Sequence, residues 1–397
     1  MSQFAPETAI PVVVDRNFPI EVFEQTVRGI ADSKVVDGIQ MWDQMTGWNP
    51  RCLWTPDRTP LARAVPDLDS FADWFPMMAY AAAIAPELNS VISLDTIRRN
   101  PAELVQTMLT LANITKGRAT FHIGAGEMKQ IQPFGHDAKQ KMGRHEDFYR
   151  IFDAFRSNNT TPVDFVGKYT QLDQAWLGVA RNHIPKIYGL GGGPKVVDLA
   201  TSYADGFSTM GVMVWSDPER TAEEIGRFKQ KLNAKGRDPE QFGFAAYFPC
   251  LLHEDDSVID RALDHDFSRW HATIWGRINQ ADWAREGLRA PMGENWHYAN
   301  DLLPVRINEA QALEMINRST RAHVEKSYLY GAPEKVAAEI QGFVDAGVTW
   351  VGILDVMPAM LTAEEGPQAL GRSIKLCELL KTAAPHTPSV SVAGAPR

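Results

Sequence analysis

Residues that could do chemistry are concentrated in the segment from 119 to 128, which reads Ala-Thr-Phe-His-Ile-Gly-Ala-Gly-Glu-Met. It begins as an apolar stretch typical of a buried strand and ends in a turn that contains Gly124 and Gly126. Glycine accepts positive φ and lets the backbone approach a ligand closely, and Glu127 places a carboxylate at the mouth of the turn. Barrel enzymes build their active faces from such strand ends. An ordinary strand-to-loop turn has the same pattern, so the segment alone leaves both interpretations open.

Two other predicted strands also end in polar residues. The second strand is followed by Asp43 and Gln44, with Trp48 close behind. An Asp at the carboxyl end of a barrel strand is frequently catalytic, although the same residue could equally cap a turn or a helix. The third strand leads into Arg98-Arg99-Asn100-Pro101, which by itself indicates a basic turn and a helix that starts with proline.

A glycine-rich turn, Gly191-Gly192-Gly193-Pro194-Lys195, precedes another predicted helix. Free backbone N–H groups at such a helix start can bind an anion, and the lysine can supplement the positive charge. Further basic residues follow the Glu127 turn. They fit a solvated helix face or, alternatively, contacts with an acidic cofactor tail: Lys129, Lys139, Lys141 and Arg144.

Composition narrows the class of protein. With 44% hydrophobic and 22% charged residues, the chain resembles an ordinary soluble globular protein. Its formal net charge of −9 argues against nucleic acid as the main partner, because phosphate binding needs a basic surface. No apolar run predicts a membrane span, and the first residues lack the features of a signal peptide. Cys52, Cys250 and Cys377 lie far apart, which predicts no metal site and fits a reducing cytoplasm.

Strand-like and helix-like segments alternate along the chain, which predicts a (β/α)₈ TIM barrel rather than an open sheet. We expect one domain over residues 1–384 and a disordered tail over 385–397. The expected strands are 9–14, 38–42, 88–94, 119–123, 184–190, 206–209, 242–252 and 350–354. The expected helices are 20–32, 71–85, from 101, 144–155, up to 204, 218–235, 334–346 and 367–382.

The alternation stops at about 258–330, which we interpret as a helical insertion in the barrel. Aromatic residues are frequent there, among them Trp270, Trp275, Trp283, Trp296 and Tyr298. They could form a satellite core or an oligomer interface. They could also belong to a lid that gives the barrel mouth a roomy apolar pocket, and the two interpretations are compatible.

Taken together and in this order, Asp43 with Trp48, the Arg98–Pro101 run, the Gly124–Glu127 turn and the Gly191–Lys195 turn resemble the bacterial luciferase-like superfamily. Within it, they resemble the branch that uses the deazaflavin coenzyme F420, and most of all its mycobacterial ketoreductases. The resemblance covers about residues 35–355. It implies a barrel with the cofactor across its carboxyl-terminal mouth, and it suggests a homodimer.

The resemblance also assigns roles to residues. Asp43, Gln44, Trp48 and Glu127 match the positions beside the reactive ring, where they would handle the proton and orient the substrate.

Cofactor contacts are implied for Gly124, Gly126 and the turn from Gly191 to Lys195, which would hold the cofactor phosphate. The bond between Val91 and Ile92 aligns with a non-prolyl cis peptide that supports the ring in the family.

One position departs from the family pattern. Relatives usually have His after the strand-end Asp, whereas this chain has Gln44, which cannot titrate. His122 lies one turn-length below Glu127 and could supply the missing proton group. The alternative is a hydrogen-bonded histidine of the core, which is the commoner situation.

The sequence therefore predicts a cytoplasmic F420-dependent oxidoreductase of the ketoreductase or alcohol dehydrogenase type. Hydride would pass between the deazaflavin and a ketone or secondary alcohol, with an apolar substrate suggested by the aromatic insertion. Two alternatives remain. One is an FMN-dependent monooxygenase of the same superfamily, and the other is a barrel that binds F420 without catalysis.

Overall fold

The computed structural model describes residues 5–12, 19–67, 69, 71–157, 160–177 and 182–382. The tail predicted over 385–397 and the last two residues of the first predicted strand, 13 and 14, lie outside these ranges. None of the described helices is long and apolar enough to cross a membrane.

Within the described residues, eight parallel strands close into a barrel, as the alternation predicts. The order around it is β11-β1-β2-β3-β4-β7-β8-β9, and β9 closes the circle by pairing with both β8 and β11. The strands are β1 (Glu7–Pro11), β2 (Gly38–Trp42), β3 (Asn89–Asp95), β4 (Ala119–Gly124), β7 (Lys186–Leu190), β8 (Gly206–Met210), β9 (Gly243–Leu252) and β11 (Trp350–Asp355). The (β/α)₈ prediction is confirmed, and the strand bounds differ from the predicted ones by a few residues.

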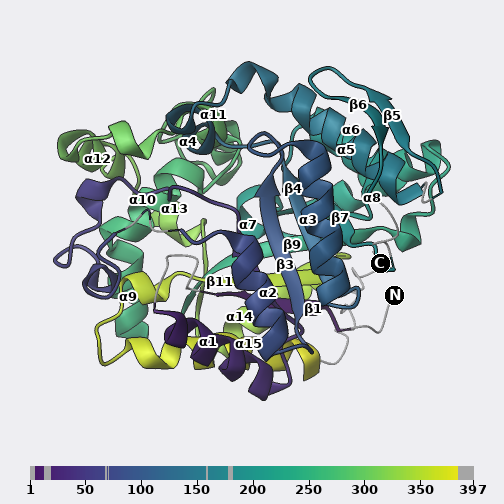
Figure 1. Cartoon of the computed structure of the whole chain (residues 1–397). Coiled ribbons are helices and arrows are strands. Elements are labelled where there is room, and N and C mark those ends of the chain that lie inside the picture. Colours follow the sequence, from purple (N-terminus) through teal and green to yellow (C-terminus); the bar gives the residue numbers. More distant parts are fainter. Residues whose placement is uncertain are drawn as a thin grey trace, which may run out of the picture.

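Helices follow the strands and cover the outside of the barrel (Figure 1). They are α1 (Ile20–Ser33), α2 (Trp74–Ile84), α3 (Pro101–Ile114), α5 (Lys141–Ser157), α6 (Pro194–Tyr203), α8 (Pro218–Ala234), α14 (Pro333–Asp345) and α15 (Ala369–Thr382). Local sequence sets their starts. Helix α3, for example, begins where the Asn100 side chain accepts a hydrogen bond from the backbone N–H of Ala102, with Pro101 in the first turn.

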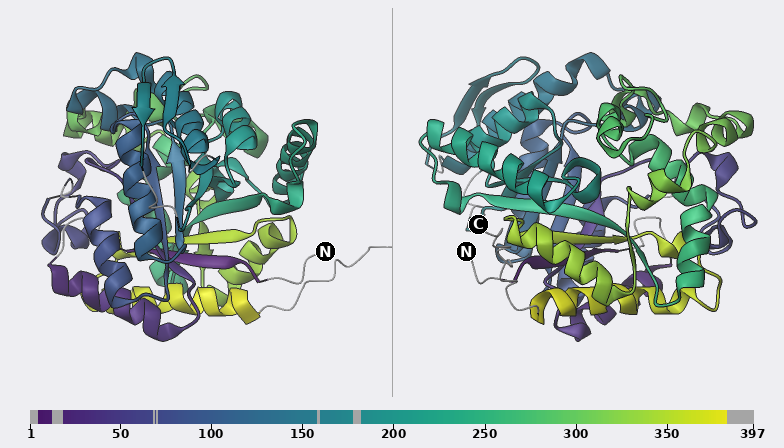
Figure 2. Two further views of the ribbon diagram at one scale, coloured as in Figure 1. Left: turned by 45° about the vertical axis from the view of Figure 1, so that its right-hand side comes forward. Right: turned by 180° about the vertical axis from the view of Figure 1, so that it is seen from behind.

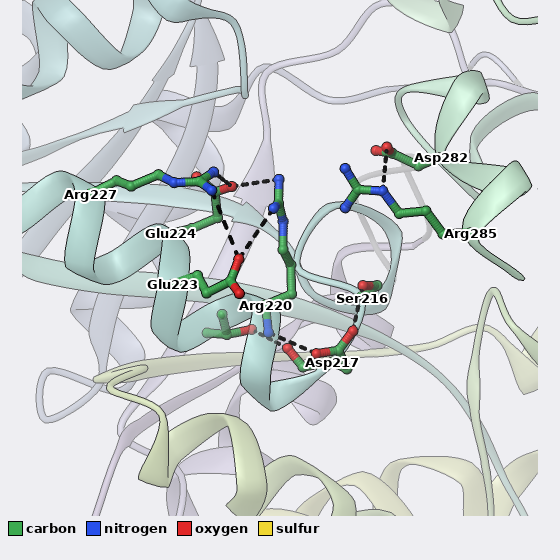
Figure 3. A network of polar contacts seen from close by, with 9 residues as sticks. Ser216, Asp217, Arg220, Glu223, Glu224, Arg227, Asp282 and Arg285 are labelled. Atoms are coloured by element: carbon green, nitrogen blue, oxygen red, sulfur yellow. Dashed lines mark hydrogen bonds and ion pairs between the residues drawn. The ribbon is translucent and has the colours of Figure 1, made fainter.

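Helix α8 shows how a polar helix face is stabilised at the surface. Its N-cap residue Asp217 accepts the backbone N–H of Arg220 at 2.7 Å. Beyond the cap, Arg220 pairs with Glu224 at 2.6 Å, and Arg227 pairs with the same glutamate at 2.6 Å. Figure 3 shows these contacts along the helix, and it also draws the separate Asp282–Arg285 pair. Such exposed pairs contribute only tenths of a kcal/mol each, about 0.3–0.5, so the buried face of α8 holds it on the barrel.

Alternate residues of each strand face two different cores. Residues that point outward pack against the helices in one large apolar cluster, which includes Phe121, Ile123 and Ile353. Residues that point inward fill the barrel with a smaller cluster that includes Val91 and Trp350. The period of two in a strand therefore decides which side chains can reach the mouth of the barrel.

Two strand elements were not predicted. The strands β5 (Val163–Val166) and β6 (Gln171–Ala175) form an antiparallel hairpin after α5, and the short strand β10 (Leu329–Gly331) pairs with the carboxyl end of β9. The hairpin strands have four and five residues and β10 has three, so none gives a long periodic signal, although β5 alternates buried and exposed residues.

The insertion packs beside the carboxyl end of the barrel, on the loop that follows β2 (Figures 1 and 2). It contains α9 (Asp256–Asp264), α10 (Asp266–Trp275), α11 (Tyr298–Asp301), α12 (Glu309–Ile316) and α13 (Arg321–Glu325). Trp270 and Trp283 are fully buried, and Trp270 packs in the large apolar cluster that also covers the barrel, so it does not form a satellite core. Trp275 and Tyr298 line a cavity, and the lid stays a prediction. The division into one domain stays a prediction.

The β5–β6 hairpin is held on α5 by a single buried carboxylate. Asp147 is 1% exposed and accepts the backbone N–H groups of Lys168, Tyr169 and Thr170 at 2.7–3.0 Å. Gly167 makes this approach possible, because a Cβ there would lie 2.4 Å from the Asp147 carboxylate. One buried charge therefore satisfies three backbone donors.

We predict that Asp147→Asn lowers the free energy of unfolding by about 1–3 kcal/mol, because an amide replaces a buried carboxylate acceptor that three backbone donors share. The matched control is Asp164→Asn, which changes an exposed carboxylate that accepts the backbone N–H of Gln174 at 2.7 Å. Urea unfolding of both variants measures the difference. If Asp147→Asn and Asp164→Asn lower the free energy of unfolding equally, the burial of Asp147 adds nothing to stability.

Candidate active site

A cavity of about 650 Å³ opens at the carboxyl ends of β2, β3, β4, β7 and β8. Its walls bring together most of the residues singled out in the sequence, although these are up to 150 positions apart in the chain. The predicted residues that line it are Asp43, Gln44, Trp48, Gly124, Gly126, Glu127, Gly191, Gly192 and Gly193. Val91, Ile92, Pro194 and Lys195 do not line it.

The first corner of the cavity is a paired carboxylate at the end of β2. The Asp43 side chain is 5% exposed, and its Oδ1 lies 2.5 Å from Nη2 of Arg98, whose side chain is 6% exposed. Arg98 also donates a hydrogen bond to the Asp43 carbonyl oxygen. Arg99 lies 3.5 Å from the same Oδ1 and 3.0 Å from Asp73. The two arginines thus compensate a charge that burial would otherwise destabilise by several kcal/mol.

The second corner is a paired carboxylate at the end of β4. Lys129 Nζ lies 3.0 Å from Oε2 of Glu127, donates to the carbonyl oxygen of Thr46 at 2.9 Å, and lies 4.5 Å from the ring centre of Trp48. Lys129 is 2% exposed, so its expected place on a solvated helix face is wrong. Burial lowers the pKa of Lys129, while the carboxylate of Glu127 opposes that shift. Charge pairing across the α4 turn (Met128–Ile131) explains why this lysine is inside.

A third carboxyl group, which sequence reasoning missed, lies between these corners. Asp95 is the last residue of β3, lines the cavity, and pairs in register with Gly124 of β4. Burial raises its pKa to about 7, and the neighbouring charge of Glu127 adds to the shift, whereas Arg98 opposes it. The sequence contains one signal for this residue. Asp95 follows Val91 and Ser93 at a spacing of two, so its side chain faces inward at the end of a strand.

Gln44 and Trp48 line the same wall. The Gln44 amide oxygen is buried and has no hydrogen-bond partner among the described residues. Two residues of the insertion hold Trp48 in place. Trp270 donates its Nε1–H to the Trp48 carbonyl oxygen at 3.1 Å, and the ring centroids of Trp48 and Trp275 lie 6.3 Å apart. Gln44 therefore offers an acceptor or donor to a ligand, and Trp48 a rigid apolar surface.

The glycine turn forms another part of the wall, at the start of α6, after the strand β7 that pairs with β4. Gly191 has φ of +148°, a conformation that favours glycine, and Gly193 is the N-cap residue of α6. A Cβ at Gly192 or Gly193 would meet no atom within 4 Å, so the backbone here borders open space. The first N–H groups of the helix can therefore meet an anion without an intervening side chain. Lys195 lies apart, 57% exposed and 3.5 Å from Glu146.

The expected cis peptide at Val91–Ile92 is wrong, because no described peptide bond is cis. Both residues lie inside β3, where pairing with β2 and β4 continues without interruption, and a regular ladder needs trans bonds. Val91 packs in the inner cluster and Ile92 in the outer one. The cavity begins two residues further on, at Ser93, Leu94 and Asp95.

His122 lies below the cavity, within the barrel. It is fully buried, and its Nδ1 lies 3.0 Å from Ser208 Oγ and 2.6 Å from the Tyr247 hydroxyl. The Tyr188 ring stacks on it with centroids 5.3 Å apart. Burial lowers the pKa of His122 to about 3, so the ring is neutral near pH 7. His122 does not line the cavity, and its position fits the hydrogen-bonded core histidine rather than the replacement for the residue at position 44.

The remaining wall is largely apolar and comes from the loop after β2 and from the insertion. Its residues are Trp54, Leu61, Phe267, Trp275 and Ile278. The cavity thus has a charged side and an apolar side. A molecule bound in it would meet both charged groups and aromatic rings, with Trp48 between Lys129 and Trp275.

Known proteins are similar to this chain along most of its length. The ketoreductase of phthiodiolone and phenolphthiodiolone dimycocerosates from Mycobacterium kansasii is 25% identical over 324 residues, which covers 80% of this chain and 87% of the relative. The F420-dependent glucose-6-phosphate dehydrogenase of Kineococcus radiotolerans is 24% identical over 339 residues, or 84% of each chain.

Solved structures share the fold. An F420-dependent secondary alcohol dehydrogenase, solved in complex with an F420-acetone adduct, superposes with a TM-score of 0.67 at 18% identity. The alignment covers 95% of this chain and 99% of that one. In addition, the family model described as luciferase-like monooxygenase matches residues 53–349, which is well over half of the sequence. The chain belongs to the luciferase-like monooxygenase family.

Proposed function

We propose that the protein is a coenzyme F420-dependent oxidoreductase that transfers a hydride between the deazaflavin and a ketone or secondary alcohol. The observation that carries this proposal is the joining of two features in one cavity. Glu127 and Asp43, the acidic residues at the strand ends, share it with the open glycine turn at Gly191–Gly193. F420-dependent relatives and a structural neighbour with the same cofactor support the assignment.

The residues present fit such a cofactor. A volume of about 650 Å³ lies within the range of small-molecule sites. The open space at Gly192 and Gly193 leaves a place for a phosphate on backbone N–H groups, and buried oxygens of Asp43 and Gln44 have no hydrogen-bond partner among the described residues. When bound, a reduced deazaflavin supplies a hydride from its ring. The protein then has to orient the ring, exclude water and manage one proton.

In this proposal, the charged side of the cavity performs those tasks. Asp43 and Glu127 set the electrostatic field around the reacting carbonyl group, and one carboxyl group of this side supplies the proton. Gln44 and Trp48 orient the ring or the substrate. The aromatic wall formed by Trp54, Phe267 and Trp275 favours a ketone or alcohol with an apolar substituent.

The first test is cofactor binding. We predict that the purified chain binds F420 in the micromolar range or tighter and FMN at least about tenfold more weakly, with quenching of cofactor fluorescence as the measurement. Tight FMN binding without F420 binding would favour a monooxygenase. F420 binding without turnover in a broad screen of ketones and secondary alcohols, followed by F420 absorbance, would favour a barrel that only binds the cofactor.

The glycine wall gives a second test. Gly193→Ala adds a methyl group in open space at a backbone conformation of φ −71° and ψ 149°, which alanine adopts easily. We therefore expect normal folding but an F420 affinity lowered by about tenfold, because the methyl group would occupy the place of the phosphate. Gly226→Ala in α8, where the added Cβ also meets nothing, is the control and should bind F420 as the wild type does. If Gly193→Ala binds F420 with the wild-type affinity, the phosphate does not bind at this turn.

Glu127 gives a third test. We predict that Glu127→Gln lowers kcat for ketone reduction by roughly 10²-fold and changes the Kd of F420 by less than about threefold, because the charge acts on the proton transfer. Glu286→Gln is the matched control: Glu286 pairs with Arg277 at 2.7 Å, and that arginine is as buried as Lys129. Turnover equal to the wild type in Glu127→Gln would refute the role of Glu127.

A further inference from the structure

The three carboxyl groups at the mouth of the barrel differ in how they are held. Asp43 is paired with Arg98 at 2.5 Å, and Glu127 is paired with Lys129 at 3.0 Å. The Asp95 carboxyl, in contrast, has no hydrogen-bond or ion-pair partner in the part of the chain that the structure describes. Two of the groups are therefore each paired with a buried cation, and the third is not.

The Gly124–Gly126 turn is shaped around this third carboxyl group. A Cβ on Gly124 would lie 3.0 Å from Asp95 Oδ1, and a Cβ on Gly126 would lie 3.7 Å from Asp95 Cγ. A side chain on Gly124 would crowd the carboxyl group, whereas a Cβ on Gly126 would make an ordinary contact with it. Gly124 therefore keeps a space beside the Asp95 carboxyl group, which lines the cavity.

Charged and titratable groups from every neighbouring element act on Asp95. Glu127 and Asp43 are negative and raise its pKa, and Arg98 and Lys129 are positive and lower it. Two further groups complete the surroundings: Lys141 on α5 and the Tyr298 hydroxyl on α11, which is hydrogen-bonded to Glu127. Because burial outweighs these charges, the pKa of Asp95 rises to about 7, so an appreciable fraction of the carboxyl group keeps its proton near neutral pH.

We propose that Asp95 is the catalytic acid that protonates the substrate oxygen, with Glu127, paired with Lys129, as its neighbour. This inference rests on the proposed function. In ketone reduction, the carbonyl carbon accepts the hydride that the reduced deazaflavin supplies, and the carbonyl oxygen accepts the proton of Asp95 as the C=O π bond breaks. The products are the alcohol, the oxidised cofactor and the Asp95 carboxylate, which takes up a proton from solvent. Alcohol oxidation is the reverse, with the carboxylate as base.

The other candidates for this acid are weaker. A general acid must hold a proton at the working pH and must reach the reacting atom. Glu127 is paired with Lys129 at 3.0 Å, and Gln44 has no proton of suitable acidity. His122 is neutral and lies below the cavity without lining it. Asp355 at the end of β11 lines the cavity, and burial also raises its pKa to about 7, but it accepts the backbone N–H of Met357 at 3.1 Å and its strand is not a neighbour of β2, β3 or β4. Asp95 combines a titratable proton with access to the cavity beside Asp43 and Glu127.

The first arm of the test needs neither substrate nor turnover. Infrared difference spectra of the full chain between pH 5 and pH 9 should show the C=O stretch of a protonated carboxyl group that is lost near pH 7. Asp95→Asn should remove one such component. Asp355→Asn is the comparison, because burial also raises the pKa of Asp355 to about 7. It should remove a separate component, since the Asp355 carboxyl accepts the backbone N–H of Met357 at 3.1 Å, and should leave the Asp95 component in place. An Asp95→Asn spectrum equal to that of the wild type overturns the proposal.

The second arm uses F420 binding and the reduction of a defined methyl ketone series. Asp95→Asn should lower kcat by roughly 10²–10⁴-fold and leave the Kd of F420 within about threefold. For the wild type, reduction needs the protonated acid, so kcat should be highest below pH 7 and fall as the pH rises through about 7. Glu127→Gln should move this limb to lower pH, because it removes a negative charge that raises the pKa of Asp95.

The outcomes separate the two proposals. If the chain binds F420 and reduces ketones, but Asp95→Asn keeps the wild-type rate or the wild-type pH limb, Asp95 is not the acid and the proposed function stands. If the chain neither binds F420 nor reduces any ketone, the proposed function fails, and the catalytic role of Asp95 in it falls as well, whatever the infrared titration shows.

Discussion

The site depends on pairing charges that are out of contact with bulk water. Isolated ions in a protein interior cost several kcal/mol each, and a partner at short range offsets much of that cost. Arg98 and Lys129 are almost completely buried, and each has a carboxylate within 3.0 Å. Removal of Asp43 or Glu127 would leave a buried cation without this partner, whereas removal of Arg98 would leave Asp43 paired with Arg99 at 3.5 Å. The mouth of the barrel can therefore keep fixed charges in a low-dielectric cavity, where they act on a ligand more strongly than they would in water.

The barrel supplies this pairing through the order of its strands. β2, β3 and β4 are neighbours in the sheet, so residues just after their carboxyl ends meet although about 85 positions separate Asp43 from Lys129. The insertion then closes over the same corner. Tyr298 reaches Glu127, and Lys141 donates to Asn300 at 2.8 Å, so α11 is fixed to the charged side while Trp270 fixes Trp48. The lid and the charged corner thus form one packed unit.

The sequence predicts the barrel strands and turns better than it predicts the burial and pKa values of the charged side chains. Periodic apolar segments identify the eight barrel strands, and Gly124, Gly126 and Gly191 mark turns that the structure places at the cavity. The burial of Lys129 could not be predicted, because a lysine near a helix start is usually solvated and only the non-local contacts with Thr46 and Trp48 show otherwise. Nor could the state of Asp95 be predicted, since its pKa depends on burial and on charges from other strands.

The carboxyl groups at the mouth of the barrel bear on the role of the glutamine at position 44. In the proposed function, a site with glutamine rather than a titratable side chain at this strand end can still move a proton if another group has the right acidity and access. We propose Asp95 for this part, because burial raises its pKa to about 7 and no cation among the described residues is paired with its carboxyl group. In this proposal Asp43 and Glu127, each paired with a buried cation, shape the electrostatic field, and Asp95 supplies the proton. The proposal leaves Gln44 to recognise a carbonyl oxygen or a ring edge by hydrogen bonding, a task for which a neutral amide is well suited.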